Sequence, residues 1–86
     1  MANYKIEISL TADRQFKELP QLEQLRIARA IQQLGANPYP TGCRKLTGYK
    51  DMFRIRVGNY RVIYSVDKKR IVIIILKIGH RKDVYR

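Results

Sequence analysis

Apolar and polar residues alternate in two neighbouring segments of the chain, 53–57 and 60–64. A period of two is typical of strands that bury one face. Gly58-Asn59 between them suits a two-residue loop, because glycine readily supplies the positive φ of a type II′ turn. The pattern therefore predicts a β-hairpin in which Arg56 lies directly opposite Arg61.

Arginines gather on the polar face of this predicted hairpin. Directly opposed residues project from the same face of a sheet, and Arg54 shares that face because it lies two residues before Arg56. Like charges placed opposite each other across strands destabilise a sheet. A sequence that keeps Arg56 opposite Arg61 beside a regular apolar face is therefore expected to hold an anion there.

The first half of the chain predicts a strand followed by two helices. Alternation favours a strand over Tyr4–Leu10, and Thr11 suits the N-cap of a short helix that Pro20 ends. A second helix is predicted over Gln21–Leu34, with Gly35 as its C-terminal stop. Its apolar stripe recurs every three residues, at Leu22, Leu25, Ala28, Ile31 and Leu34.

Turn-forming residues over 37–42 predict a loop that continues through 44–49. After the hairpin, a turn at 67–69 leads to a strand over Arg70–Ile78, which is apolar on both faces and so suits the centre of a sheet. The order is β-α-α-β-β-β. It predicts one α+β domain over 1–86: an N-terminal strand, a helical hairpin and a three-stranded antiparallel meander in one mostly antiparallel sheet. The helices cover one face and leave the other for this chain or a partner.

Charge is concentrated in the second half. The chain has 18 Lys and Arg against 7 Asp and Glu, a net charge of +11. Residues 1–43 hold five basic and four acidic side chains, so 44–86 hold the other 13 and three. A basic surface confined to the strands predicts a polyanionic partner, nucleic acid before an acidic protein. No amphipathic basic helix supports binding to a membrane surface.

Cysteine usage and hydropathy indicate the cellular compartment in which the protein is expected. Cys43 is the single cysteine, which leaves no disulfide framework, and we interpret it as incidental. The N-terminus lacks an apolar signal region, and the longest apolar run, 71–76, is too short to span a membrane. The expected location is the cytoplasm.

The residue types favour a reaction that needs neither a cofactor nor a metal ion. No His/Cys/Asp/Glu cluster has metal-ligand spacing, and no glycine-rich phosphate loop is present. RNA can supply its own nucleophile, because its 2′-OH can attack the adjacent phosphorus. Arg56 and Arg61 would then stabilise the charged phosphorane, with Arg54 on a flanking phosphate. Solvated surface arginines are the simpler alternative.

The C-terminal segment, residues 79–86, is expected to leave the sheet beside these arginines, with Gly79 permitting a sharp exit. Arg81 would bind phosphate or protonate the leaving 5′-oxygen. Tyr85 would stack on a base, accept the 2′-OH proton, or serve only as a packing anchor. His80 is another candidate for a catalytic role, but a lone histidine is more often a surface group than a catalyst.

The chain resembles the RelE side of the RelE/ParE toxin superfamily in three motifs: Lys45-Leu-Thr-Gly48, the hairpin 53–64, and Gly79-His-Arg-Lys-Asp-Val-Tyr85. The resemblance implies a toxin that enters the ribosomal A site and cleaves mRNA there. It also implies an acidic, RelB-like antitoxin that wraps the toxin in a hetero-oligomer.

The resemblance also assigns residues. It places an essential basic pair at Arg54 and Arg56, a hairpin arginine at Arg61, a post-strand arginine at Arg81 and a terminal tyrosine at Tyr85. Together with the residue analysis, this predicts the catalytic set Arg56, Arg61, Arg81 and Tyr85. The predicted RNA-binding residues are Arg44, Lys45, Arg54, His80 and Lys82. Well-known members carry lysines where Arg54 and Arg56 stand, which favours a charge role over proton transfer at these positions. Two alternatives stay open: a ParE-like inhibitor of DNA gyrase, and a non-catalytic module that binds RNA or the ribosome.

Overall fold

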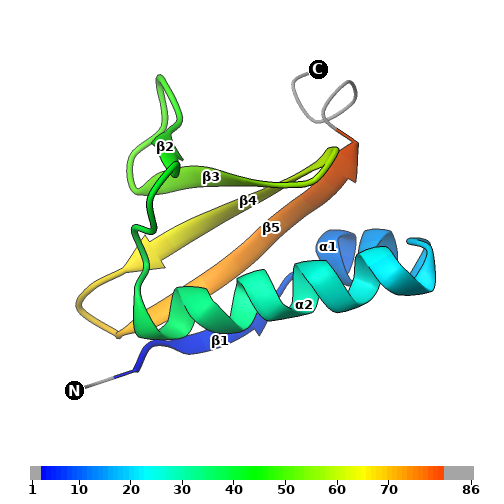
Figure 1. The fold of residues 1–86 in the computed structure, drawn as a ribbon. Helices are drawn as coiled ribbons and strands as arrows, with labels where there is room; N and C mark the ends of the chain where they lie inside the picture. Colours follow the sequence, from blue (N-terminus) through cyan, green and yellow to red (C-terminus); the bar gives the residue numbers. More distant parts are fainter. Residues whose placement is uncertain (1–2, 81–86) are drawn as a thin grey trace.

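The computed structural model describes residues 3–80. Strand β1 (Lys5–Ile8) leads into helices α1 (Leu10–Lys17) and α2 (Gln21–Ala36). Four strands follow: β2 (Arg44–Lys45), β3 (Met52–Val57), β4 (Tyr60–Asp67) and β5 (Val72–His80). They form one sheet in the order β1-β5-β4-β3-β2 (Figure 1). The β1–β5 pair is parallel and the others are antiparallel, which confirms the predicted α+β fold and adds β2, a strand the pattern did not predict.

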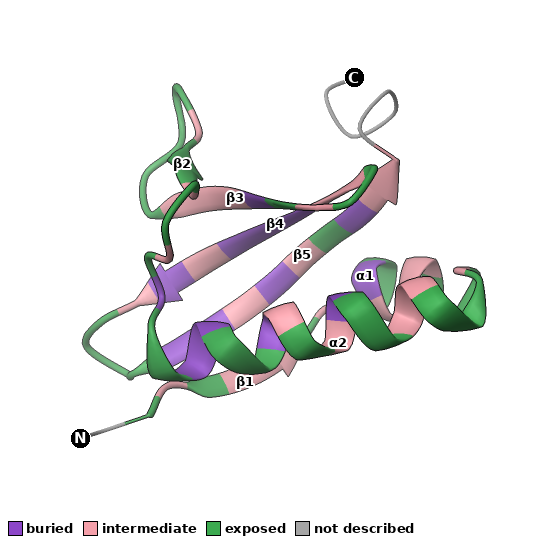
Figure 2. Ribbon diagram, in the orientation of Figure 1, coloured by how far each residue is buried: buried purple, intermediate pink, exposed green. Residues whose placement is uncertain are grey.

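Both helices pack on one face of the sheet, as predicted, and we call the opposite side the open face. The core lies between helices and sheet (Figure 2). It unites Ala12 of α1 and Ile27, Ile31 and Leu34 of α2 with apolar side chains of the three central strands: Ile55, Val62, Tyr64, Val66, Ile73, Ile75 and Ile78. Their burial stabilises the fold, because each buried aliphatic side chain contributes about 1.5–3 kcal/mol.

The hairpin has the predicted register. Val57 pairs with Tyr60 and Arg56 pairs with Arg61. Gly58 begins the loop with φ of 61°, the positive value that the first residue of a type II′ turn requires. The two-residue loop therefore places both arginines on one face.

The predicted apolar stripe on α2 is wrong in its first half. Leu22 and Leu25 are 58% and 61% exposed, whereas Ile27, Ile31 and Leu34 are buried. Residues three apart fall about 60° short of a full helical turn, so a stripe with that spacing drifts around the helix. Leu22, nine residues before Ile31, ends up on the opposite side of α2.

Gly35 lies inside α2 and is not its stop. Its carbonyl accepts the Tyr4 N–H at 2.8 Å, and a Cβ at position 35 would lie 3.2 Å from the Tyr4 carbonyl oxygen. Close approach of the chain before β1 therefore accounts for a glycine here. The helix ends one residue later, at Ala36, and Asn37 is its extended C-cap.

Ser9, and not the predicted Thr11, is the N-cap of α1. Its hydroxyl also forms a hydrogen bond with the sheet. The Ser9 hydroxyl accepts the Ala12 N–H and donates to the Leu76 carbonyl, both at 3.1 Å. Leu76 is the extra residue of a β-bulge, because Ile63 pairs with Lys77 while the next residue pairs with Ile75. No local pattern indicates this bulge, since its partners are distant in the chain.

Strand β5 begins two residues later than predicted because the turn before it is longer. The Asp67 carboxylate accepts the backbone N–H groups of Lys69 and Arg70 at 3.1 and 3.0 Å. Ile71 then takes a left-handed conformation, with φ of 57°, before the strand starts at Val72. Side-chain to backbone hydrogen bonds of this kind are typical of aspartate in turns.

Gln15 of α1 also braces the bulge, which makes it a test of the fold. Its side-chain oxygen accepts the N–H of Ile78 at 2.7 Å, and Ile78 is buried. Gln15→Ala would leave that N–H unsatisfied, so we expect unfolding free energy to fall by about 1–3 kcal/mol in urea titrations. Gln32→Ala, at an exposed position of α2, should change it little. Equal stability of the two variants would contradict this role for Gln15.

Candidate nucleic-acid interface

Two rows of side chains cross the open face at its hairpin end. In the row nearest the loop, Arg56 of β3 pairs with Arg61 of β4, which pairs with Gly79 of β5. Directly opposed residues in such ladders lie about 4.5–5.5 Å apart at Cα. Gly79 lies inside β5 and not at the sharp exit we expected; it adds no side chain beside Arg61. The row therefore carries two guanidinium groups on adjacent strands.

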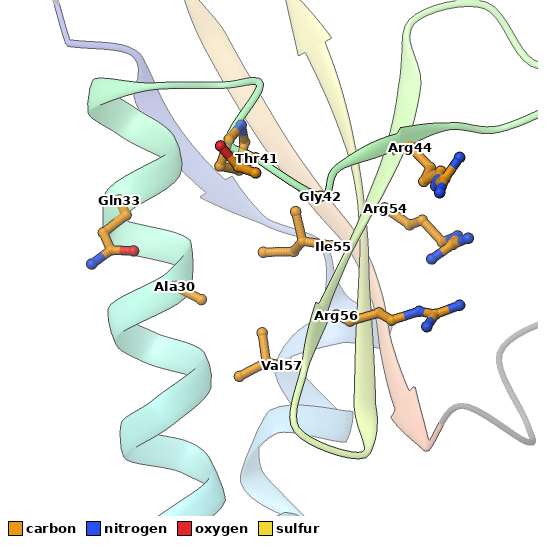
Figure 3. Close-up of a pocket in the computed structure, with 10 residues that line it drawn as sticks. Ala30, Gln33, Thr41, Gly42, Arg44, Arg54, Ile55, Arg56 and Val57 are labelled. Atoms are coloured by element: carbon orange, nitrogen blue, oxygen red, sulfur yellow. The ribbon is translucent and has the colours of Figure 1, made fainter.

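The second row lies two residues further along the strands. Arg44 of β2 pairs with Arg54 of β3, Arg54 with Ile63 of β4, and Ile63 with Lys77 of β5. Figure 3 shows Arg44, Arg54 and the neighbouring Arg56 extending to one side of β3, away from α2, while Ile55 points towards the helix. The alternation of β3 thus separates a charged face from the core, as the sequence predicted.

The two rows bring together five cations: Arg44, Arg54, Arg56, Arg61 and Lys77. The paired positions of these rows include no acidic residue. The ion pairs Lys17–Asp13 and Arg26–Glu23, at 3.0 and 3.4 Å, lie on the helices instead. Such a one-signed patch attracts a polyanion, and arginine forks match phosphate oxygens in pairs.

Arg61 differs from its neighbours in burial. Arg56 is exposed, whereas Arg61 is partly buried and its Nε atom is shielded from solvent. A partly buried guanidinium has fewer conformations to lose when it binds an anion, and its charge is screened less by water. Of this pair, Arg61 is therefore the more constrained side chain.

The remaining predicted residues fall into three groups. Lys45 pairs with Phe53 and still lines the groove beside Arg44. His80 pairs with Tyr60, and their rings meet edge-on with centroids 5.7 Å apart. Because His80 follows Gly79 directly, strand alternation puts it on the face opposite Arg61. The third group, Arg81, Lys82 and Tyr85, lies outside the described residues, and these assignments stay predictions.

Sequence reasoning missed a groove on the open face. It has a volume of about 920 Å³ and lies between the β2–β3 loop and β5. Ile63, Leu76 and Met52 contribute apolar side chains, and Tyr49 and Lys77 also line it. The signal for Lys77 was visible as the one charge in an apolar strand. The groove itself was not, because a bulge and a loop 30 residues away create it.

A second hollow of about 560 Å³ lies between α2 and β3. Ala30 and Gln33 line it from the helix, and Ile55 and Val57 from the strand. Arg44, Arg54 and Arg56 stand at its far side (Figure 3). Arg44 and Arg54 thus line both this hollow and the groove.

Tyr64 anchors the segment that leads to Arg44. Its hydroxyl donates to the Pro38 carbonyl at 2.7 Å, and the Tyr64 ring is completely buried. Burial, with a smaller effect of neighbouring Cys43, raises the pKa of Tyr64 well above its usual value. The phenol therefore stays neutral and keeps donating, which fixes the loop before β2.

Residues 3–80 contain no group of three His, Cys, Asp or Glu side chains close enough to hold a metal ion. In the same range, neither helix is long and apolar enough to cross a membrane.

Fold and charge together define a class: small, basic α+β domains whose sheet carries arginines on the face opposite the helices. Residues 6–85 match the family of the ParE toxin of type II toxin–antitoxin systems. Toxin RelG of Mycobacterium tuberculosis is 31% identical, covering 96% of this chain and 97% of its own. Toxin RelE3 of Methanocaldococcus jannaschii is also 31% identical and covers 94% of both chains.

Solved structures agree. The archaeal RelE–RelB complex from Pyrococcus horikoshii superposes with a TM-score of 0.83 at 33% identity, covering 95% of this chain and 99% of that one. The RelBE2 toxin–antitoxin complex from Mycobacterium tuberculosis gives 0.83 at 26% identity, covering 96% and 97%. The chain belongs to the RelE/ParE superfamily of type II toxins, in its RelE-like branch.

The direct opposition of Arg56 and Arg61 should lower the stability of the fold. Arg56→Gln removes a like-charge contact across β3 and β4, so unfolding free energy should rise by about 0.2–1 kcal/mol in low salt. The gain should shrink in high salt, because screening already weakens the repulsion. Denaturant titrations at two salt concentrations measure both effects.

Arg29→Gln, at an exposed position of α2, is the matched control for loss of one positive charge. A stability gain equal in the two variants would mean that total charge, and not the Arg56–Arg61 contact, is responsible.

Proposed function

We propose that this protein is a toxin that cleaves mRNA in the ribosomal A site and so stops translation. The observation that carries the proposal is the direct opposition of Arg56 and Arg61 on the open face, next to the other cations of the two rows. Membership of the RelE-like branch supports it, as do the names of the related toxins. Its place of action would be the cytoplasm, where translation occurs.

The proposed reaction uses the RNA's own nucleophile. The 2′-oxygen bonds to the adjacent phosphorus, and the bond from phosphorus to the 5′-oxygen of the next nucleotide breaks. The products are a 2′,3′-cyclic phosphate and a 5′-hydroxyl. Arg56 and Arg61 would stabilise the extra negative charge of the phosphorane. Donors preorganised for that charge contribute about 3–4 kcal/mol each.

Proton transfers in this scheme rest on the family resemblance. Arg81 would protonate the leaving 5′-oxygen, and Tyr85 would accept the 2′-OH proton or stack on a base. Arg54 and Arg44, in the second row, would bind flanking phosphates. His80 packs against Tyr60 on the other side of the strand, which makes it the weakest of the RNA-binding assignments.

Arg61→Ala is the sharpest test of this proposal. Loss of one preorganised donor should slow cleavage about 10²–10³-fold, while the fold stays intact because Arg61 is outside the core cluster. The measurement is the mapping of new mRNA 5′ ends on ribosomes after induction. Arg29→Ala on α2 serves as the control and should cleave normally.

Full cleavage by Arg61→Ala would refute the arginine assignment. If the wild-type protein binds RNA with a steep salt dependence yet produces no new 5′ ends, it is a non-catalytic RNA- or ribosome-binding module instead.

The match to the ParE toxin family favours a second candidate function, inhibition of DNA gyrase. The two candidates differ in which synthesis fails first. Pulse labelling after induction should show protein synthesis stopping before DNA synthesis if mRNA is the target. If DNA synthesis stops before protein synthesis, the result would support inhibition of DNA gyrase.

We also propose that an acidic, RelB-like antitoxin neutralises the protein in a hetero-oligomer. Two structural relatives are RelE–RelB or RelBE complexes, and the five-cation patch would attract an acidic partner. Co-expression with a RelB-like protein encoded beside this chain should restore growth and yield a complex that withstands size-exclusion chromatography. Arg56→Gln should speed its dissociation by salt, since it removes one attractive charge. Growth arrest that the neighbouring protein cannot relieve would contradict this pairing.

A further inference from the structure

The side chains on the open face change from charged to apolar along the strands. Its first row, next to the hairpin loop, is Arg56, Arg61 and Gly79. The second row places Ile63 between Arg54 and Lys77. One step further along the strands, about 6.6 Å, Met52 pairs with Ser65 and Ser65 with Ile74. Positively charged side chains are thus replaced by an apolar surface within two rows of paired residues.

Ile63 is the centre of this apolar surface. It is only 6% exposed, yet it does not belong to the core cluster beneath the helices. It lines the 920 Å³ groove with Leu76 and Met52, both partly buried. The bulge that Ser9 holds puts Leu76 beside Lys77 at this position. The groove therefore has an apolar floor bordered by the cations of the second row.

Tyr49 supplies an aromatic wall. Its side chain lines the groove and the residue is 58% exposed. The loop that carries it is tied down at both ends: the Leu46 N–H donates to the Met52 carbonyl at 2.9 Å, and the Asp51 carbonyl accepts the Val66 N–H at 3.0 Å. A large ring on an anchored loop can stack on a ligand without first being ordered.

The combination identifies the ligand. A nucleobase has flat apolar faces for Tyr49 and Ile63, and polar edges for Thr11 and Thr47, two hydroxyl-bearing residues that also line the groove. Its sugar-phosphate continues towards charged groups, which Arg54 provides because it lines both this groove and the hollow beyond β3. An aliphatic side chain of an acidic protein would use the floor and the charges, but neither the hydroxyls nor the stacking surface.

We infer that the groove binds one nucleobase of the RNA strand whose phosphates lie on Arg54, Arg56 and Arg61, and so contributes base selectivity next to the cleavage point. The inference rests on the proposed function for its substrate, RNA. It goes further by assigning a base-binding site to Tyr49, Ile63 and Leu76, one row away from the arginine pair.

The test uses the purified full chain and short 2′-O-methyl RNA, which cannot undergo 2′-OH attack. Each base is replaced in turn by an abasic residue. One position should lose about ten-fold in affinity or more, as expected for one stacked base, and the others less. Tyr49→Ala should abolish that position's penalty, whereas Tyr49→Phe, which keeps the ring, should retain it.

Methyl NMR signals provide a second readout on the unmodified protein. The Ile63 and Leu76 methyls should shift with the complete RNA and not with the oligonucleotide that lacks the base concerned. Equal affinity for every abasic oligonucleotide would overturn the inference. So would shifts of these methyls with an acidic peptide but not with RNA, which would assign the groove to a protein partner.

The test of base binding in the groove can succeed or fail independently of the test of mRNA cleavage. A single sensitive base position in a protein that produces no new mRNA ends would support the groove and reject cleavage. Cleavage without any sensitive position would reject the groove alone.

Discussion

The structure depends on the constraint that sets Arg56 against Arg61 at the tip of a tight hairpin. A two-residue loop fixes the register, and the register fixes which side chains share a face. The repulsion costs about 0.2–1 kcal/mol, whereas burying side chains such as Ile55 and Val62 on the other face contributes about 1.5–3 kcal/mol each. Core packing therefore holds the like charges together on one face of the sheet.

A second constraint acts across the sheet. Ser9, the N-cap of α1, bonds to Leu76 in the bulge of β5, and Gln15 of α1 bonds to Ile78 two residues further on. Beyond the bulge, the backbone of β5 is displaced by one residue relative to β4. That displacement puts Gly79 beside Arg61 and Lys77 beside Ile63. The helix side of the molecule thereby sets the arrangement of the open face. One sheet consequently carries a charged row and an apolar groove side by side.

Site residues were predictable where their positions depend on sequence neighbours only a few residues away. Arg54, Arg56 and Arg61 followed from alternation and a two-residue loop, because strand geometry determines the face of each residue. Arg44 was expected nearby but in a loop, since a strand of two residues is too short to show a period. His80 was grouped with the arginines by its nearness in sequence, and alternation after Gly79 separates it from them.

The sequence by itself determined the order of the elements, the hairpin register, the central position of β5 and the concentration of charge on the strands. Each of these depends on neighbours a few residues apart. Only the tertiary structure decided which side of α2 is buried, why Gly35 is a glycine, and where the groove at Ile63 opens. Those features arise where segments 30 or more residues apart meet, at contacts such as Tyr4 with Gly35, and no periodicity within one segment encodes them.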